Sequence, residues 1–129
     1  MKMKRKSMIS MGLAVGLLAL GGAAQAGTTY SNYDTTVASF NGSGYTGYQT
    51  KSSSNASGTL VSKTVGGSYT VDARMTASSG TGSWVRSVSD NETRSLSNSI
   101  SSGRSTRVQF SNDLTTPVSV QVTGQWKSN

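Results

Sequence analysis

Two segments of this chain alternate apolar and polar side chains residue by residue. From residue 118 to 126, valine, glycine and tryptophan fill every second position, and serine, glutamine and threonine fill the others. Residues 68–76 show the same period, with Tyr69, Val71 and Ala73 as inward candidates. Successive side chains of a strand point to opposite faces of a sheet, so this period of two predicts β-strands that are buried on one face.

Weaker alternation and turn-forming residues predict further strands around these two. We expect them at residues 36–40, 45–51, 59–65, 83–89, 94–100 and 104–111. No segment after Gly27 has the apolar spacing of a helix. The sequence therefore predicts an all-β fold, an antiparallel β-sandwich of about seven to eight short strands, with a small barrel as the alternative.

The dipeptide Gly66-Gly67 suits a tight hairpin turn between residues 59–65 and 68–74. Such a hairpin places Leu60 opposite Ala73 and makes Lys63 a diagonal neighbour of Asp72. Both tryptophans, Trp84 and Trp126, are expected in the core, because a chain this polar needs large apolar anchors.

The first 26 residues have the three parts of a cleavable signal peptide of bacterial type. A Lys/Arg-rich start precedes a short apolar run, and Ala24 and Ala26 supply the small residues needed before cleavage at Gly27. We therefore predict export by the general secretory route, a flexible leader at residues 27–34 and a single domain at residues 35–129. No second apolar stretch follows that would span a membrane.

Removal of residues 1–26 changes the charge of the chain considerably. Four of the 12 lysines and arginines lie there, which leaves eight against five acidic residues and a net charge of +3 instead of +7. This mild basicity does not indicate nucleic acid as a partner. Ser and Thr make up 39 of the 103 residues from Gly27 onward, and there is no cysteine, so burial and strand pairing alone must hold the domain.

Few residues of the chain are suited to catalysis. It contains no histidine, no cysteine and only five carboxylates. Asp90 and Glu92 are the one pair close in sequence, and they fit either a simple turn or part of a calcium loop. We expect a non-enzymatic protein without a cofactor.

Two sets of residues are candidates for binding. Tyrosines among small polar residues resemble the composition of antibody binding loops, in which rigid aromatic rings lie beside adaptable polar groups. These tyrosines are Tyr30, Tyr33, Tyr45 and Tyr48. The second set is a candidate anion contact and consists of Arg74, Arg86, Arg94, Arg104 and Arg107.

The layout as a whole resembles small exported β-sandwich proteins of unknown function from Gram-positive bacteria and their phages. The resemblance rests on the signal peptide, the Tyr/Ser-rich start, residues 59–75 and the ending at residues 118–126. In size, export signal and composition the chain also resembles the bacteriocins of the lactococcin 972 type. Neither resemblance supplies functional residues.

These observations leave three hypotheses for function. The first is a secreted domain that binds an envelope polymer, a glycan or another secreted protein. The second is a secreted antagonistic protein. The third is a self-assembling surface protein, which would follow if the strand at residues 118–126 lay at a sheet edge.

Overall fold

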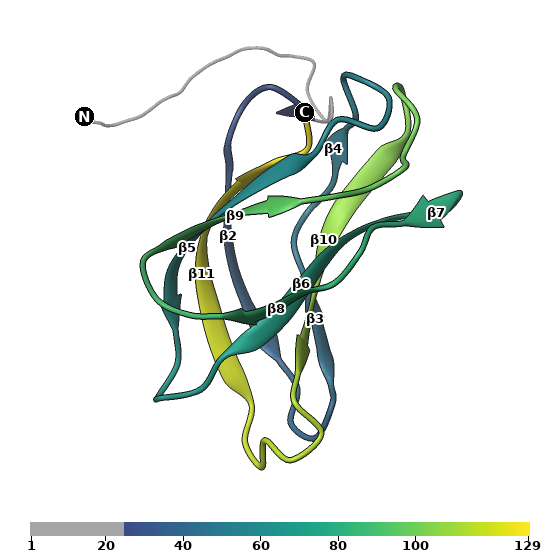
Figure 1. Ribbon diagram of the computed structural model, residues 1–129. Coiled ribbons are helices and arrows are strands. Elements are labelled where there is room, and N and C mark those ends of the chain that lie inside the picture. Colours follow the sequence, from purple (N-terminus) through teal and green to yellow (C-terminus); the bar gives the residue numbers. More distant parts are fainter. Residues whose placement is uncertain (1–24) are drawn as a thin grey trace, which may run out of the picture.

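The computed structural model describes residues 25–129, which form two β-sheets packed face to face (Figure 1). One is a four-stranded sheet and the other a seven-stranded sheet. Apart from the parallel pair β1–β4, all strand pairs are antiparallel. The predicted antiparallel sandwich is confirmed. The predicted signal peptide lies almost wholly outside the described residues.

The four-stranded sheet has the order β2 (Ser31–Val37), β11 (Val120–Lys127), β5 (Gly58–Val65), β9 (Glu92–Leu96). The main path of the seven-stranded sheet is β1 (Gln25–Ala26), β4 (Gln49–Thr50), β10 (Ser105–Asn112), β6 (Val71–Ala77), β7 (Gly80–Thr81). In addition, β3 (Ser43–Tyr45) pairs with β10 and β8 (Val85–Val88) pairs with β6. Eight of these strands have three residues or more, which agrees with the predicted number.

The alternating pattern identifies the core correctly. In β11, Val120, Val122 and Trp126 are at most 2% exposed and Gly124 is also buried, whereas Gln121, Thr123 and Gln125 face solvent at least partly. In β10, Val108 and Phe110 are fully buried. The inner faces of the two sheets thus meet in a largely apolar layer, and polar residues fill most of the outward positions of the strands.

The predicted hairpin at Gly66-Gly67 is wrong. The segment before it, β5, pairs with β11 and β9, and the segment after it, β6, pairs with β10 in the other sheet. The two glycines therefore carry the chain across the sandwich. Leu60 and Ala73 are both fully buried as predicted, but they approach the core from opposite sheets. The expected contact of Lys63 with Asp72 is absent, because β5 and β6 belong to different sheets; the Asp72 carboxylate pairs with Arg86 instead.

The expected leader at residues 27–34 and the domain start at residue 35 also need correction. Residues 31–34 are not a leader, since β2 begins at Ser31 and pairs with β11 along its whole length. The domain therefore includes residues that were assigned to the leader. The predicted cleavage before Gly27 would remove β1, and β4 would still be paired with β10.

The strand that suggested self-assembly does not lie at an edge. β11 is central, with β2 on one side and β5 on the other. Its backbone hydrogen-bonding groups are used within the sheet on both sides. The structure thus removes the reason for the self-assembly hypothesis.

Buried polar side chains tie the sheets together in this cysteine-free chain. The amide of Gln49 on β4 donates to the carbonyl of Trp126 at 3.0 Å and accepts from the backbone N–H of Ser128 at 2.8 Å. At the other end of the sandwich, the amide of Asn112 on β10 donates to the carbonyl of Val37 on β2 at 3.0 Å. Because these hydrogen bonds are shielded from water, they raise the free energy needed to separate the two sheets.

Lys51 has a similar structural role. Its side chain is 1% exposed, and its ammonium group donates to the carbonyls of Ser53 and Ala56, both at 2.7 Å, and of Asn129 at 3.2 Å. Burial lowers the pKa of the Lys51 amine. The contacts with Ser53 and Ala56 hold the loop after β4 together, and the contact with Asn129 ties this loop to the last residue of the chain.

Candidate binding face

The outer face of the seven-stranded sheet brings together residues from both candidate sets. Gln109 on β10 lies opposite Tyr45 on β3 and opposite Arg74 on β6, so these three side chains share one face. The Arg74 Nε–H donates to the Gln109 side-chain oxygen at 2.9 Å. The amide nitrogen of Gln109 donates to the hydroxyl of Ser43 at 3.1 Å. A row of hydrogen-bonded side chains therefore crosses three strands.

Beside this row, Arg107 on β10 lies against two tyrosines. Its guanidinium carbon is 3.9 Å from the ring centroid of Tyr45 and 4.9 Å from that of Tyr48. Both rings are open to solvent, with Tyr45 39% and Tyr48 52% exposed. A guanidinium stacked on a ring is attracted to the π-electrons and loses freedom, which prepares both groups for a ligand.

At the β6 end of the row, Trp84 lies against two further arginines. The guanidinium carbons of Arg74 and Arg86 are 4.4 Å and 5.8 Å from its ring centroid. Asp72 holds this end in place, since its carboxylate accepts from Arg86 at 2.7 Å and from the backbone N–H of Ser87 at 3.1 Å. Trp84 is only half-buried. The expectation that Trp84 is a core residue is therefore wrong, whereas that for Trp126, which is 1% exposed, is confirmed.

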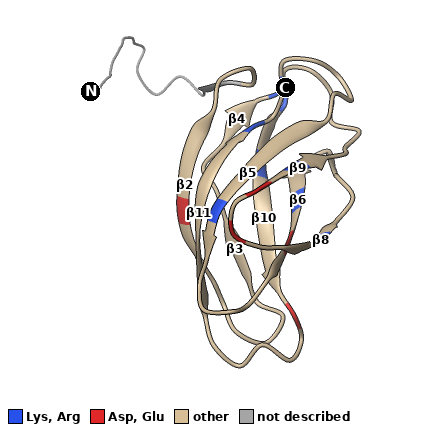
Figure 2. Ribbon diagram, turned by 60° about the vertical axis from the view of Figure 1, so that its left-hand side comes forward, with Lys and Arg blue, Asp and Glu red and all other residues tan. Residues whose placement is uncertain are grey.

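We call this surface the Arg–aromatic face. It comprises Tyr45, Tyr48, Arg74, Trp84, Arg86 and Arg107. Of its three positive charges, that of Arg86 is paired with Asp72, whose side chain is 11% exposed, and among the described residues Arg74 and Arg107 form no salt bridge. The positions of basic and acidic residues along the whole fold are marked in Figure 2. This face is thus positive, aromatic and rigidly supported.

Three other predicted site residues lie elsewhere. Arg94 is on β9 in the four-stranded sheet and pairs with Glu92 at 3.0 Å. Arg104 is exposed in the loop before β10. Tyr30 is 40% exposed and contacts Lys127, whose ammonium nitrogen is 4.8 Å from the ring centroid. The structure brings none of these three into the Arg–aromatic face.

Tyr33 is not a ligand-binding residue of the surface. It is 6% exposed, and its ring packs in the core with its centroid 5.0 Å from that of Phe110. Its hydroxyl is buried and has no hydrogen-bond partner among the described residues. Burial raises the pKa of Tyr33 to about 12, because the phenolate form would lose its hydration.

Stability at alkaline pH should therefore depend on Tyr33. The folded protein resists ionisation of this phenol up to a pH of about 12, whereas the unfolded chain ionises near its ordinary value of 10.0. The Tyr33 contribution is fully present below pH 10 and is lost as the pH rises towards 12, by at most about 2–3 kcal/mol. Urea unfolding of the wild type and of Tyr33→Phe at pH 8 and pH 11 measures it.

The Tyr33→Phe variant should change the free energy of unfolding by less than about 1 kcal/mol at pH 8, since the lost hydroxyl leaves no partner unpaired. It should lose less stability than the wild type between pH 8 and pH 11. Equal losses for the two proteins would contradict the assignment.

The Asp90–Glu92 turn is occupied by structural contacts. The Asp90 carboxylate accepts from the backbone N–H of Val65 at 2.6 Å. The Glu92 carboxylate accepts from the hydroxyl of Ser89 at 2.5 Å and from Arg94 at 3.0 Å. Hydrogen bonds from these two groups lower the pKa of Glu92. These contacts favour the turn over the calcium loop.

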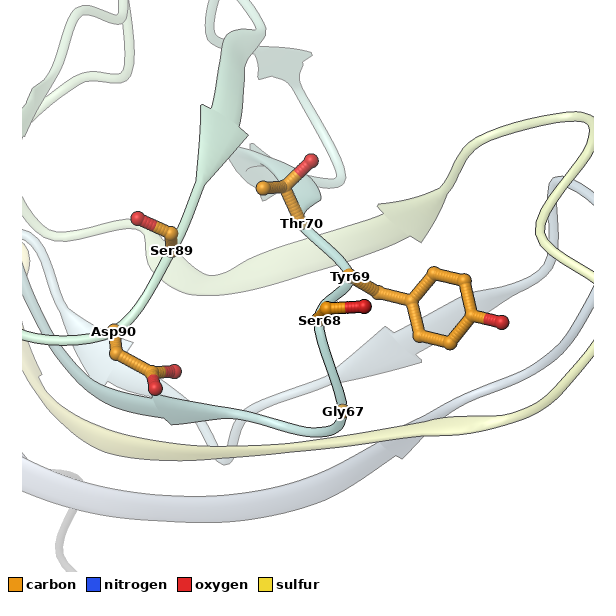
Figure 3. Close-up of a pocket in the computed structure, with 6 residues that line it drawn as sticks. All are labelled: Gly67, Ser68, Tyr69, Thr70, Ser89 and Asp90. Carbon is orange, nitrogen blue, oxygen red and sulfur yellow. The ribbon is translucent and has the colours of Figure 1, made fainter.

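An open pocket of about 270 Å³ adjoins this turn. It is lined by Gly67, Ser68, Tyr69, Thr70, Ser89 and Asp90. Figure 3 shows the Tyr69 ring pointing away from Asp90, so the ring and the carboxylate do not converge on one ligand position.

Within residues 25–129, no three side chains of the His, Cys, Asp and Glu types are grouped in a way that could hold a metal ion. The same part of the chain has no helix with the length and hydropathy needed to cross a membrane.

Sequence reasoning missed one member of the Arg–aromatic face, Trp84, and two residues that support the face, Gln109 and Asp72. Gln109 and Asp72 are ordinary polar positions of alternating strands, and nothing in their spacing marks them. Trp84 did carry a signal, because Val85 follows it directly and two neighbours in a strand cannot both face the core.

No protein-family model, no curated protein and no solved structure matches this chain.

Proposed function

We propose that this protein is a secreted, non-enzymatic binding domain that acts outside the bacterial cell and holds an anionic polymer of the envelope on its Arg–aromatic face. One observation carries the proposal. Three arginines lie over three exposed or partly buried aromatic rings on one sheet face, and among the described residues only one of the three, Arg86, forms a salt bridge. Export is supported by the signal-peptide pattern of residues 1–26.

The chemistry of the face fits such a partner. Arginine presents its N–H groups as a planar fork that matches the oxygens of a phosphate or carboxylate. Tyrosine and tryptophan rings offer rigid apolar planes with a polar edge, which suit the mixed surface of a glycan chain. Arginine, tyrosine and tryptophan are also the residues that contribute most to binding energy at protein surfaces.

Retention on isolated bacterial cell walls tests the proposal. The wild type should bind, and binding should weaken as salt rises from 50 to 500 mM, because the ions screen an exposed charge contact. Tyr45→Ala and Tyr48→Ala should each weaken binding about 3- to 10-fold through loss of the stacked ring, or about 0.7–1.4 kcal/mol.

Lys63→Ala is the matched control. Lys63 is an exposed cation on β5 in the four-stranded sheet, so the variant changes a charge on the opposite layer. Its retention should equal that of the wild type. If the wild type is not retained on walls or on their purified anionic polymers, the proposed function is wrong.

A further inference from the structure

The three arginines of the Arg–aromatic face differ in what they already bind. Arg86 forms a salt bridge with Asp72 at 2.7 Å, so its charge is balanced within the protein. Arg74 donates from Nε to Gln109, and its guanidinium lies 4.4 Å from the Trp84 ring centroid. Among the described residues, the Arg107 guanidinium has no hydrogen-bond or salt-bridge partner and is held only by its two tyrosines.

This difference distinguishes the arginines that hold Trp84 in place from the arginine that is free to contact a ligand. Asp72 accepts from both Arg86 and the backbone of Ser87, which has a positive φ of 58° in β8. The carboxylate thereby holds the irregular β8 backbone, where the pairing with β6 shifts register, beside Trp84. Arg74 and Arg86 serve mainly to fix the indole ring in place.

Arg107 is prepared in a different way. Stacking on Tyr45 restrains the guanidinium and covers its plane, but the N–H groups at its edge remain available as donors. An arginine restrained in this way loses less conformational freedom when an oxyanion binds.

We infer that Arg107, restrained by Tyr45 and Tyr48, is the residue that binds an oxyanion of the polymer, and that Trp84 is a separate, uncharged platform for the same chain. This inference rests on the proposed function. The ligand group is a phosphate or a carboxylate, whose two oxygens match the guanidinium fork. Tyr45 lies on β3 and Trp84 next to β8, about three strand spacings or 14 Å apart, so one polymer segment would have to cross the strands to reach both.

The test compares variants that remove charged groups inside and outside the Arg–aromatic face. Arg107→Gln removes the one cation of the face whose guanidinium has no hydrogen-bond or salt-bridge partner among the described residues. Arg104→Gln removes the same kind of cation from an exposed loop outside the face. The double variant Asp72→Asn with Arg86→Gln removes an ion pair while keeping side-chain size and net charge. Each is measured by calorimetry or interferometry against a purified polyglycerol phosphate and a polyuronate, with neutral dextran as a third probe.

Arg107→Gln should weaken binding to the anionic polymer about 10-fold, and the other two variants should change it less than 3-fold. Arg107→Lys should recover only part of the affinity, because an ammonium group lacks the planar fork. The polymer that binds identifies the oxyanion, a phosphate or a carboxylate. Trp84→Ala should weaken binding to that polymer without changing its dependence on salt.

The outcomes distinguish this inference from the proposed function. If the wild type binds an anionic polymer but Arg107→Gln binds as well as Arg104→Gln, the role of Arg107 is wrong and the proposed function stands. A larger loss for the Asp72/Arg86 double variant than for Arg107→Gln would also overturn it. If the wild type binds neither anionic probe and is not retained on walls, the proposed function itself has failed. Circular dichroism of every variant confirms that it is folded.

Discussion

Trp126→Ala should lower the free energy of unfolding by about 3–5 kcal/mol, enough to unfold a domain of this size under mild conditions. Trp126 is 1% exposed and lies on the central strand β11, between Ser31 of β2 and Leu60 of β5. Its removal would leave a cavity that the surrounding strands cannot fill, because both neighbours are fixed by backbone pairing. Urea or thermal unfolding followed by circular dichroism measures the effect.

Trp84→Ala provides the matched control for this prediction. It removes the same side chain from a partly buried position on the Arg–aromatic face, outside the apolar core. The expected loss of stability is below about 1.5 kcal/mol. The two variants should thus separate stability from binding, since Trp126 contributes to the first and Trp84 to the second. Equal losses of stability would contradict the assignment of Trp126 to the core and Trp84 to the surface.

Gly124→Val should be at least as damaging, with an expected loss of about 3 kcal/mol or more. Gly124 lies directly opposite Tyr33 in the pairing of β11 with β2. A Cβ atom at this position would overlap the backbone carbonyl oxygen of Val61 and would lie 2.7 Å from the Tyr33 hydroxyl oxygen. The carbonyl belongs to the neighbouring strand β5 and cannot rotate away, so the sheet itself would have to shift.

Gly47→Ala is the control for Gly124. A Cβ atom at Gly47 would meet no other atom within 4 Å, and this glycine is exposed in the loop between β3 and β4. The change should alter stability by less than about 0.5 kcal/mol. The smaller variant Gly124→Ala should already be clearly destabilised, and a loss within 0.5 kcal/mol for it would show that the close approach of Val61 is not a real constraint.

The inward-facing residues of several strands were predictable without the structure. The faces of β10 and β11 follow from a period of two, which is a local property of an extended backbone. The same reasoning would have placed Tyr33 in the core, because Tyr33, Thr35 and Val37 occupy alternate positions of residues 31–37. The tyrosine-rich composition of that region indicates a binding surface, but the period of two depends on the backbone and therefore determines on which side Tyr33 lies.

Errors arose where a local pattern fits two arrangements. Gly66-Gly67 suits a tight hairpin turn and equally a crossing between sheets, and Leu60 and Ala73 face inward in both. For the binding residues, composition singled out Tyr45, Tyr48 and the arginines, but not the grouping of Arg107 with the tyrosines or of Arg74 and Arg86 with Trp84. Those groups depend on which strands are neighbours.

The sequence by itself determined that this chain forms strands, which side of several strands is apolar, and that it lacks histidine and cysteine chemistry. Only the tertiary structure decided that β3, β10, β6 and β8 lie side by side and so place Tyr45, Arg107, Arg74 and Trp84 on one surface. The physical reason is the range of the interactions. The direction of a side chain depends on its own backbone, whereas strand pairing depends on contacts between residues up to several dozen positions apart, which alternation does not encode.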